Sequence, residues 1–192
     1  MAFGPSSGYR GAVHRLFVAI RPPPDQRAAL IALQSGVEGA RWQDDAQLHL
    51  TLRFIGEVDR HQAQDVADSL TAVRFAPFDA RLEGVGHFER KGATDSLWVG
   101  TQPRAPLEAL HLKIDRACVR AGLPPERRAY LPHVTIARFG RRGAFVAPFL
   151  ARNAGFVAPR FTVQAFTLYE SHLGHAGAHY EPIQTYPNMP TA

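Results

Sequence analysis

The chain has 192 residues, of which 45% are hydrophobic, 20% are charged and 10% are aromatic. This composition is ordinary for a globular protein, and it excludes a disordered chain, a collagen-like repeat and a disulfide-rich scaffold. The formal net charge of +5 permits a polyanionic partner but does not identify one.

The termini and the hydropathy pattern predict one domain without a membrane segment. Residues 1–14 are expected to be a flexible leader, because they are rich in Gly, Ser and Pro and lack the apolar stretch of a signal peptide. Residues 15–186 follow as a single domain, and residues 187–192 are expected to be a flexible tail. No run approaches the roughly 18 consecutive apolar residues of a membrane span. The lone Cys118 excludes an internal disulfide and lies on an apolar helical stripe, so a buried thiol and a cytoplasmic protein are expected.

The first third of the chain is predicted as strand, helix, strand and helix. Residues 15–20 have an apolar strand pattern, and prolines then open a helix that is expected to reach about Val37. Strict alternation over residues 47–54 predicts a half-buried strand. Apolar residues at helical spacing from Ala63 to Val73 predict an amphipathic helix.

The alternating segment assigns its side chains to two faces, since neighbouring residues of a strand point in opposite directions. The core face is expected to hold Leu48, Leu50, Leu52 and Phe54. The polar face is expected to hold Gln47, His49, Thr51 and Arg53.

A hairpin and a long helix are predicted in the middle of the chain. Strands over residues 78–89 and 96–100 are expected to be joined by the turn-like segment 90–93. A helix over residues 105–121 then ends at Gly122, a residue suited to a helix C-terminus.

The last third contains a second polar-faced strand and two closing strands. Residues 132–139 alternate in the same way, and a loop of Arg, Gly, Ala and Pro follows. Two further strands are predicted over residues 161–170 and 178–184. Because strands joined by short turns argue against a purely parallel sheet, the order of elements indicates an α+β fold.

The two polar-faced strands share the pattern His-apolar-Thr-apolar, at residues 49–52 and 133–136. The motifs lie 84 residues apart, and each follows a helix and a loop, so an internal duplication is indicated. If the strands meet, two imidazoles and two hydroxyls converge on one cavity. One imidazole can accept a proton while the other donates one, and threonine hydroxyls can donate to phosphate oxygens. That set suits hydrolysis of a phosphodiester without a metal.

At these motifs the chain resembles the 2H phosphoesterase superfamily, and in particular the bacterial and archaeal RNA 2′,3′-cyclic phosphodiesterases, also called 2′-5′ RNA ligases. The resemblance extends over most of the chain and is carried by residues 15–20, 49–58, 97–100, 132–138 and 166–171. It implies a bilobal α+β fold of two related, pseudo-symmetric halves. Antiparallel sheets would flank a central cleft, with the helices outside.

The resemblance also implies a reaction and residue roles. RNA ending in a 2′,3′-cyclic phosphate would be hydrolysed to leave a 2′-phosphate, with no cofactor and no metal, by a protein expected to be a monomer. His49 would protonate the leaving 3′ oxygen, and His133 would activate water. Thr51 and Thr135 would bind the phosphate.

A fifth residue, Arg138, is included because the family often has a basic residue five positions after the second histidine. By strict alternation Arg138 faces away from His133. It can reach the site only if the strand twists or bulges there. Arg53 has the right alternation but no support from the resemblance.

Several alternatives stay open. A non-catalytic module that binds RNA ends would use the same cleft, and joining of RNA ends through a 2′-5′ bond without ATP would use the same site. A metal site at His172, His175 and His179 is disfavoured, because these residues read as a hairpin loop. Phe17 and Tyr130 are candidates for stacking on a terminal base.

Overall fold

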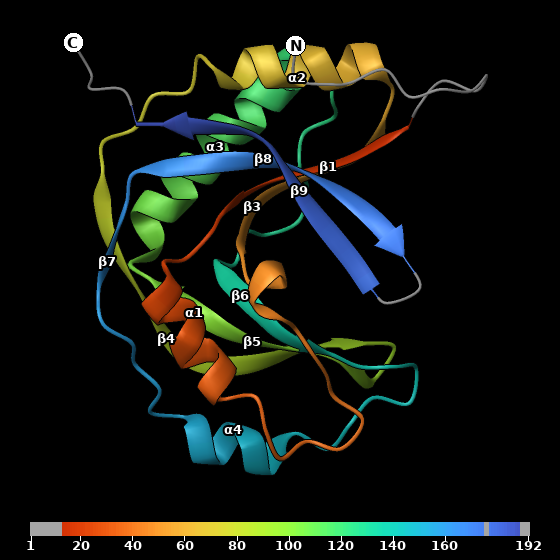
Figure 1. The fold of residues 1–192 in the computed structure, drawn as a ribbon, viewed down its shortest axis with the longest axis vertical. Helices are drawn as coiled ribbons and strands as arrows, with labels where there is room; N and C mark the ends of the chain where they lie inside the picture. The colour runs from red at the N-terminus through yellow and green to blue at the C-terminus, as the bar shows by residue number, and fades with distance from the viewer. Residues whose placement is uncertain (1–12, 175–176, 189–192) are drawn as a thin grey trace.

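The protein is described here by a computed structural model that covers residues 13–174 and 177–188 (Figure 1). The first half contains β1 (His14–Ile20), α1 (Pro24–Ala32), β2 (Arg41–Trp42), the 3-10 helix η1 (Asp45–Gln47), β3 (Leu50–Val58), α2 (Arg60–Leu70) and β4 (Phe78–Arg90). The second half contains β5 (Ala93–Gln102), α3 (Arg104–Arg120), β6 (His133–Arg138), α4 (Ala147–Asn153), β7 (Phe161–Val163), β8 (Ala165–Gly174) and β9 (Gly177–Pro187).

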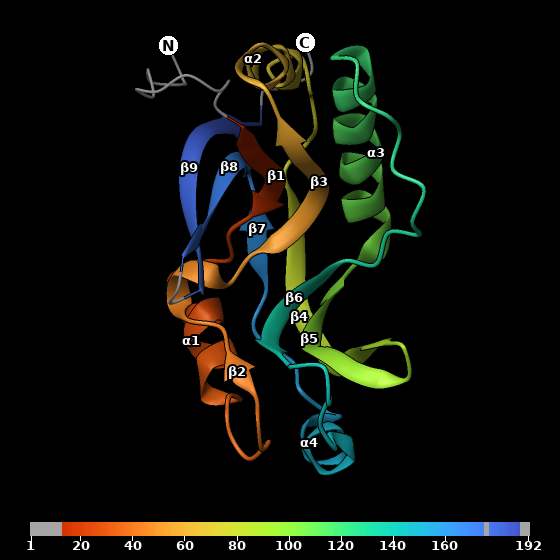
Figure 2. The ribbon, with the colours of Figure 1, turned by 90° about the vertical axis from the view of Figure 1, so that its right-hand side faces the viewer.

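The described strands form one nine-stranded antiparallel sheet, so the predicted α+β class is confirmed. Its order is β7-β4-β5-β6-β3-β1-β8-β9, and β2 pairs with β6 beside this path. Figure 1 shows α2 and α4 at opposite ends of the molecule, and Figure 2 shows α3 lying alongside β3. None of the helices in the described residues is long and apolar enough to cross a membrane.

The core lies where α3 covers the central strands. Leu52 of β3, Ile136 of β6 and Ile114 of α3 are all buried to 1% exposure or less. Cys118 is fully buried beside them, as its helical spacing predicts, and burial raises the pKa of its thiol to about 11. This core fixes which faces of β3 and β6 remain available for chemistry.

The predicted turn at residues 90–93 and the predicted end of the long helix at Gly122 are both confirmed, and both occur at residues with positive φ. Lys91 and Gly92, with φ of 54° and 76°, form the tight turn between β4 and β5. Gly122, with φ of 89°, follows the last turn of α3 and donates its N–H to the carbonyl of Val119. Leu123 donates to the carbonyl of Cys118, which completes the paired capping bonds of a Schellman motif.

The closing strands differ from the prediction. The segment 161–170 is not one strand: β7 pairs with β4, whereas β8 pairs with β1 and β9, near the other edge of the sheet. The first helix ends at Ala32 rather than near Val37. A helix that reached Val37 would include Gly36, whose φ of 72° lies outside the α-helical range. Strand β2 and helix α4 were not predicted, because both are short and lack a clear apolar period.

The predicted leader and tail fall mostly outside the described residues, which begin at 13 and end at 188. His14 is the first residue of β1, and its Nδ1 lies 2.9 Å from the carboxylate of Glu170. Pro187 is the last residue of β9, and the N–H of Asn188 donates to the carbonyl of Gln164.

Candidate active site

A cavity of about 760 Å³ lies between the β4–β5 hairpin, the β8–β9 hairpin and the ends of β1, β3 and β6. We call it the cleft. All five residues predicted from the sequence line it: His49, Thr51, His133, Thr135 and Arg138.

The two motifs meet because β3 and β6 are neighbours in the sheet. They pair through Leu50 opposite Val134, and each of these residues is flanked by the histidine and the threonine of its own motif. Leu50 and Val134 are 1% and 0% exposed, so they point into the core. The flanking side chains therefore point the opposite way, into the cleft.

The two imidazoles are held by the same hydrogen bond. Nδ1 of His49 lies 2.7 Å from the carbonyl oxygen of Gln47, and Nδ1 of His133 lies 2.7 Å from the carbonyl oxygen of Leu131. A carbonyl oxygen only accepts, so Nδ1 carries the proton and donates it in both rings. This leaves Nε2 of each neutral ring as the nitrogen that can exchange a proton with a ligand.

Aromatic rings pack around His49. The ring of Phe17 lies 4.8 Å from the imidazole, and Tyr180 meets it edge-on at 5.0 Å. Phe17 also stacks on Tyr169 at 5.2 Å and is only 3% exposed. Phe17 therefore supports His49 and leaves little of its own surface for a base, contrary to the stacking role considered for it.

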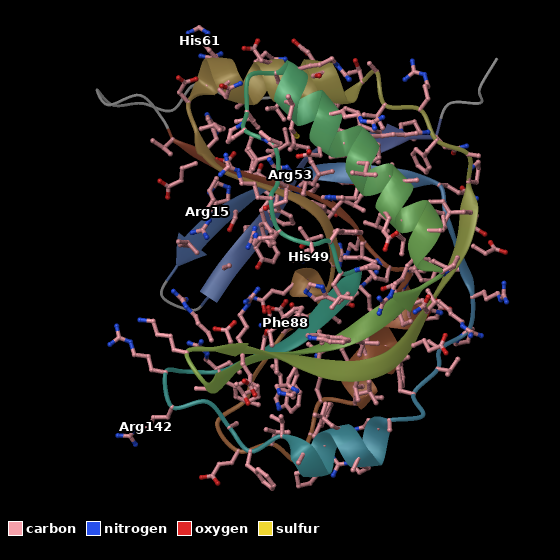
Figure 3. The ribbon with its side chains drawn as sticks, turned by 180° about the vertical axis from the view of Figure 1, so that it is seen from behind. Arg15, His49, Arg53, His61, Phe88 and Arg142 are labelled. Atoms are coloured by element: carbon pink, nitrogen blue, oxygen red, sulfur yellow. The ribbon has the colours of Figure 1, made fainter. Side chains whose placement is uncertain are left out.

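His133 is packed in a similar way from the other side of the cleft. Phe88 of β4 meets the imidazole edge-on at 4.9 Å, and the indole of Trp98 lies 6.1 Å away. Figure 3 shows Phe88 projecting from its strand below His49. The second stacking candidate, Tyr130, lies face to face with His111 at 4.2 Å and lines an adjoining cavity rather than the cleft.

This packing shifts the titration of both histidines. Burial lowers the pKa of His49 from 6.5 to about 4, and the positive charge of Arg138 adds to that effect against the opposing hydrogen bond to Gln47. Burial also lowers the pKa of His133, again with a contribution from Arg138. Both shifts favour the neutral imidazole in the free protein.

Arg138 reaches the cleft because β6 bulges. Thr135 and Ala137 pair with consecutive residues of β5, so Ile136 is an extra residue in the ladder. The bulge reverses the alternation after Thr135, and it turns Arg138 to the same face as His133. Arg138 is exposed and lines the cleft, as the resemblance implies, whereas strict alternation would turn it away from His133.

An equivalent bulge in β3 overturns two predictions. Thr51 and Arg53 pair with consecutive residues of β1, which leaves Leu52 as the extra residue. Arg53 consequently turns away from the cleft and bonds to Asp115 of α3 at 2.7 Å. Phe54, expected in the core, instead lines the cleft and is 48% exposed.

Sequence reasoning missed several other residues of the cleft, namely Arg15, Phe54, Phe88, Arg90 and Tyr180. Most of them come from the two hairpins, whose position depends on strand pairing across the whole sheet. The only sequence signal was the presence of aromatic and basic residues near the predicted turn at 90–93.

The disfavoured metal site is only partly covered by the structure, since His175 lies outside the described residues. The rings of His172 and His179 are 6.4 Å apart, and His172 lies 3.2 Å from the carboxylate of Glu181. Among residues 13–174 and 177–188, no group of three or more His, Cys, Asp or Glu side chains could hold a metal ion.

Comparison with known families and sequences gives a consistent set of matches. A model of the 2′-5′ RNA ligase superfamily matches residues 17–175. A protein of Aeropyrum pernix named RNA 2′,3′-cyclic phosphodiesterase is 33% identical over 143 residues, which are 73% of this chain and 81% of that protein. One of the same name from Geobacillus stearothermophilus is 30% identical over 148 residues, 76% of this chain, but the match spans only 47% of that protein.

Solved structures share the fold. Escherichia coli LigT, crystallised with 3′-AMP, has a TM-score of 0.78 at 25% identity, and the alignment covers 93% of this chain and 100% of that chain. Thermus thermophilus TT0787 has a TM-score of 0.71 at 26% identity, over 90% of this chain and 97% of that chain.

Proposed function

The chain belongs to the 2′-5′ RNA ligase superfamily, and from this membership we propose that it hydrolyses RNA 2′,3′-cyclic phosphate ends to 2′-phosphates without a metal. The observation that carries the proposal is the pair of imidazoles in one cleft, each held by the same Nδ1 bond to a carbonyl. Two such groups are the acid and the base that the reaction requires.

In the proposed reaction, Nε2 of neutral His133 takes a proton from a water molecule, whose oxygen attacks phosphorus. The bond from phosphorus to the 3′ oxygen breaks, and protonated His49 donates its proton to that oxygen. The phosphate remains on the 2′ oxygen. The geometry is nearly symmetric, so the assignment of donor and acceptor follows the family resemblance.

Three further side chains are proposed to bind the phosphate. The hydroxyls of Thr51 and Thr135 are placed to donate to non-bridging oxygens, where negative charge increases in the transition state. The guanidinium of Arg138 adds a fixed positive charge beside both imidazoles. A bound anionic phosphate would in turn raise the pKa of both histidines and allow one of them to hold a proton near neutral pH.

We also infer that the domain consists of two pseudo-symmetric lobes that arose by duplication. The order β4-β5-β6-β3-β1-β8 supports this, because it reads as two equivalent three-strand units that meet at β6 and β3. The residues paired at that junction, Leu50 and Val134, hold equivalent places in the two motifs, as do the bulged Leu52 and Ile136.

The proposal is tested by incubating the protein with a short RNA that ends in a 2′,3′-cyclic phosphate, in EDTA and without ATP. We expect the 2′-phosphate as the product, resolved from the 3′-phosphate by chromatography. An intact cyclic end on RNA that is nevertheless bound would favour the non-catalytic module. Activity that EDTA abolishes and zinc restores would replace the proposed mechanism with a metal-dependent one.

The pH dependence follows from the lowered histidine pKa values. The active free enzyme needs one protonated and one neutral imidazole, and both pKa values lie below 6.5. We therefore expect kcat/KM to follow a bell with its maximum below pH 6.5, and kcat to peak at higher pH because bound phosphate stabilises the imidazolium. A kcat/KM that rises steadily past pH 8 would contradict the proposed pair.

A further inference from the structure

Four arginines line the cleft, from four different parts of the chain. They are Arg15, Arg90, Arg128 and Arg138. Asp95 is the one acidic residue among the described residues that line it. The arginines outnumber the acidic lining residue, so the lining of the cleft has a net positive charge that exceeds what one phosphate needs.

Two of these arginines are not accounted for by the proposed reaction or by the fold. Arg128 is paired with Glu126 at 3.0 Å, and Arg138 lies beside the histidines. Arg15 and Arg90 are exposed and make no ion pair or hydrogen bond through their side chains with any described residue. Their guanidinium groups are available for a ligand.

Arg15 and Arg90 lie on opposite walls of the cleft. Arg15 belongs to β1, beside the β8–β9 hairpin, whereas Arg90 is the last residue of β4, at the tip of the β4–β5 hairpin. Figure 3 shows Arg15 projecting from the upper wall, on the same side as the two hairpin tips. Arg15 also remains near the reaction centre, since its charge and that of Arg138 both act on the hydroxyl of Tyr180.

The surface between the two arginines is also partly aromatic. Phe54 and Phe88 both line the cleft, and their side chains are 48% and 36% exposed. A positively charged groove with exposed aromatic rings is the usual arrangement for single-stranded nucleic acid, because cations follow the backbone and bases stack on the rings.

We propose that Arg15 and Arg90 bind the phosphodiester groups upstream of the cyclic end, so that the RNA strand leaves the reaction centre between the two hairpins. This inference rests on the proposed function and extends it. It predicts that the enzyme prefers an oligonucleotide to a cyclic mononucleotide, which carries the same reactive group but has no upstream phosphate.

The test compares uridine 2′,3′-cyclic monophosphate with a uridine tetranucleotide that ends in the same cyclic phosphate. We expect the wild-type protein to have the higher kcat/KM for the tetranucleotide. In Arg15→Gln and in Arg90→Gln the ratio of the two kcat/KM values should fall roughly fivefold, since each variant loses one exposed charge-assisted contact. Arg160→Gln, which removes an exposed arginine outside the cleft, should retain the wild-type ratio.

A second readout is the salt dependence of binding to the tetranucleotide product. Log affinity falls as log salt concentration rises, and the magnitude of this negative slope should decrease by about 0.7 for each arginine removed, as expected for one phosphate contact on a single strand. The proposed path of the RNA strand would be overturned by equal wild-type kcat/KM values for the two substrates, or by variants that slow both substrates equally. Failure to hydrolyse either substrate would instead overturn the proposed function.

Discussion

Replacing either histidine of the cleft with alanine should lower kcat by about 10²- to 10⁴-fold, the usual contribution of one general acid or base. His49 and His133 are the groups placed to move protons at the phosphate, and neither can substitute for the other in a single turnover. The double variant should be little slower than each single variant, since both act in the same step. The measurement is kcat for the cyclic-ended RNA under saturating substrate.

Two controls separate lost chemistry from lost structure. His61→Ala removes an exposed histidine of α2, which lies far from His49 in Figure 3, and should leave kcat unchanged. His49→Asn retains an amide that can donate to the carbonyl of Gln47, so it should fold normally and still be inactive. A fully active His49→Asn would remove that residue from the mechanism.

The Arg53→Met variant should be destabilised by about 3–5 kcal/mol, the usual cost of removing one partner of a largely buried ion pair, because Asp115, whose side chain is 14% exposed, loses its cation. Arg53 is 7% exposed and bonds to Asp115 at 2.7 Å, with a longer contact of 3.5 Å to Glu126. It also donates to the carbonyl of Pro124 at 2.6 Å. The free energy of unfolding, measured in urea, reports the loss.

The consequence of losing Arg53 should extend to the cleft. Arg53 connects β3 and α3 to residues 124–126, and the same loop continues to Leu131, whose carbonyl holds His133. Combining Arg53→Met with Asp115→Leu should recover part of the stability, because the double variant no longer buries that unpaired carboxylate. Arg120→Met, at an exposed position of α3, is the matched control, and an Arg53→Met variant as stable as this control would contradict the prediction.

Local patterns were sufficient to predict most elements and the two His-x-Thr motifs, whereas Arg138 was included only because of the family resemblance. The alternation around His49 and His133 identified both strands, and the apolar stripe that contains Cys118 identified α3. The repeated motif indicated that the two strands share a site, which the pairing of Leu50 with Val134 supports. These features depend on residues close together in the chain, so one sequence contains enough information to find them.

Side-chain direction beyond each threonine could not be predicted in the same way. A single bulged residue, Leu52 in β3 or Ile136 in β6, reverses the direction of the side chains that directly follow it. Strict alternation from the histidines would place Arg53 in the cleft and Arg138 on the opposite face. Because of the bulges, Arg53 is buried and Arg138 lines the cleft.

The sequence by itself determined the α+β class, the two His-x-Thr strands and the family to which the chain belongs, because these depend on short-range periodicity and motif. Only the tertiary structure decided the bulges, the split of segment 161–170 and the aromatic packing that lowers the histidine pKa values. The tertiary structure alone also placed Arg15 and Arg90 on opposite walls of one cleft. The physical reason is that strand register and hairpin position are set by pairing between residues far apart in the chain, which local periodicity does not encode.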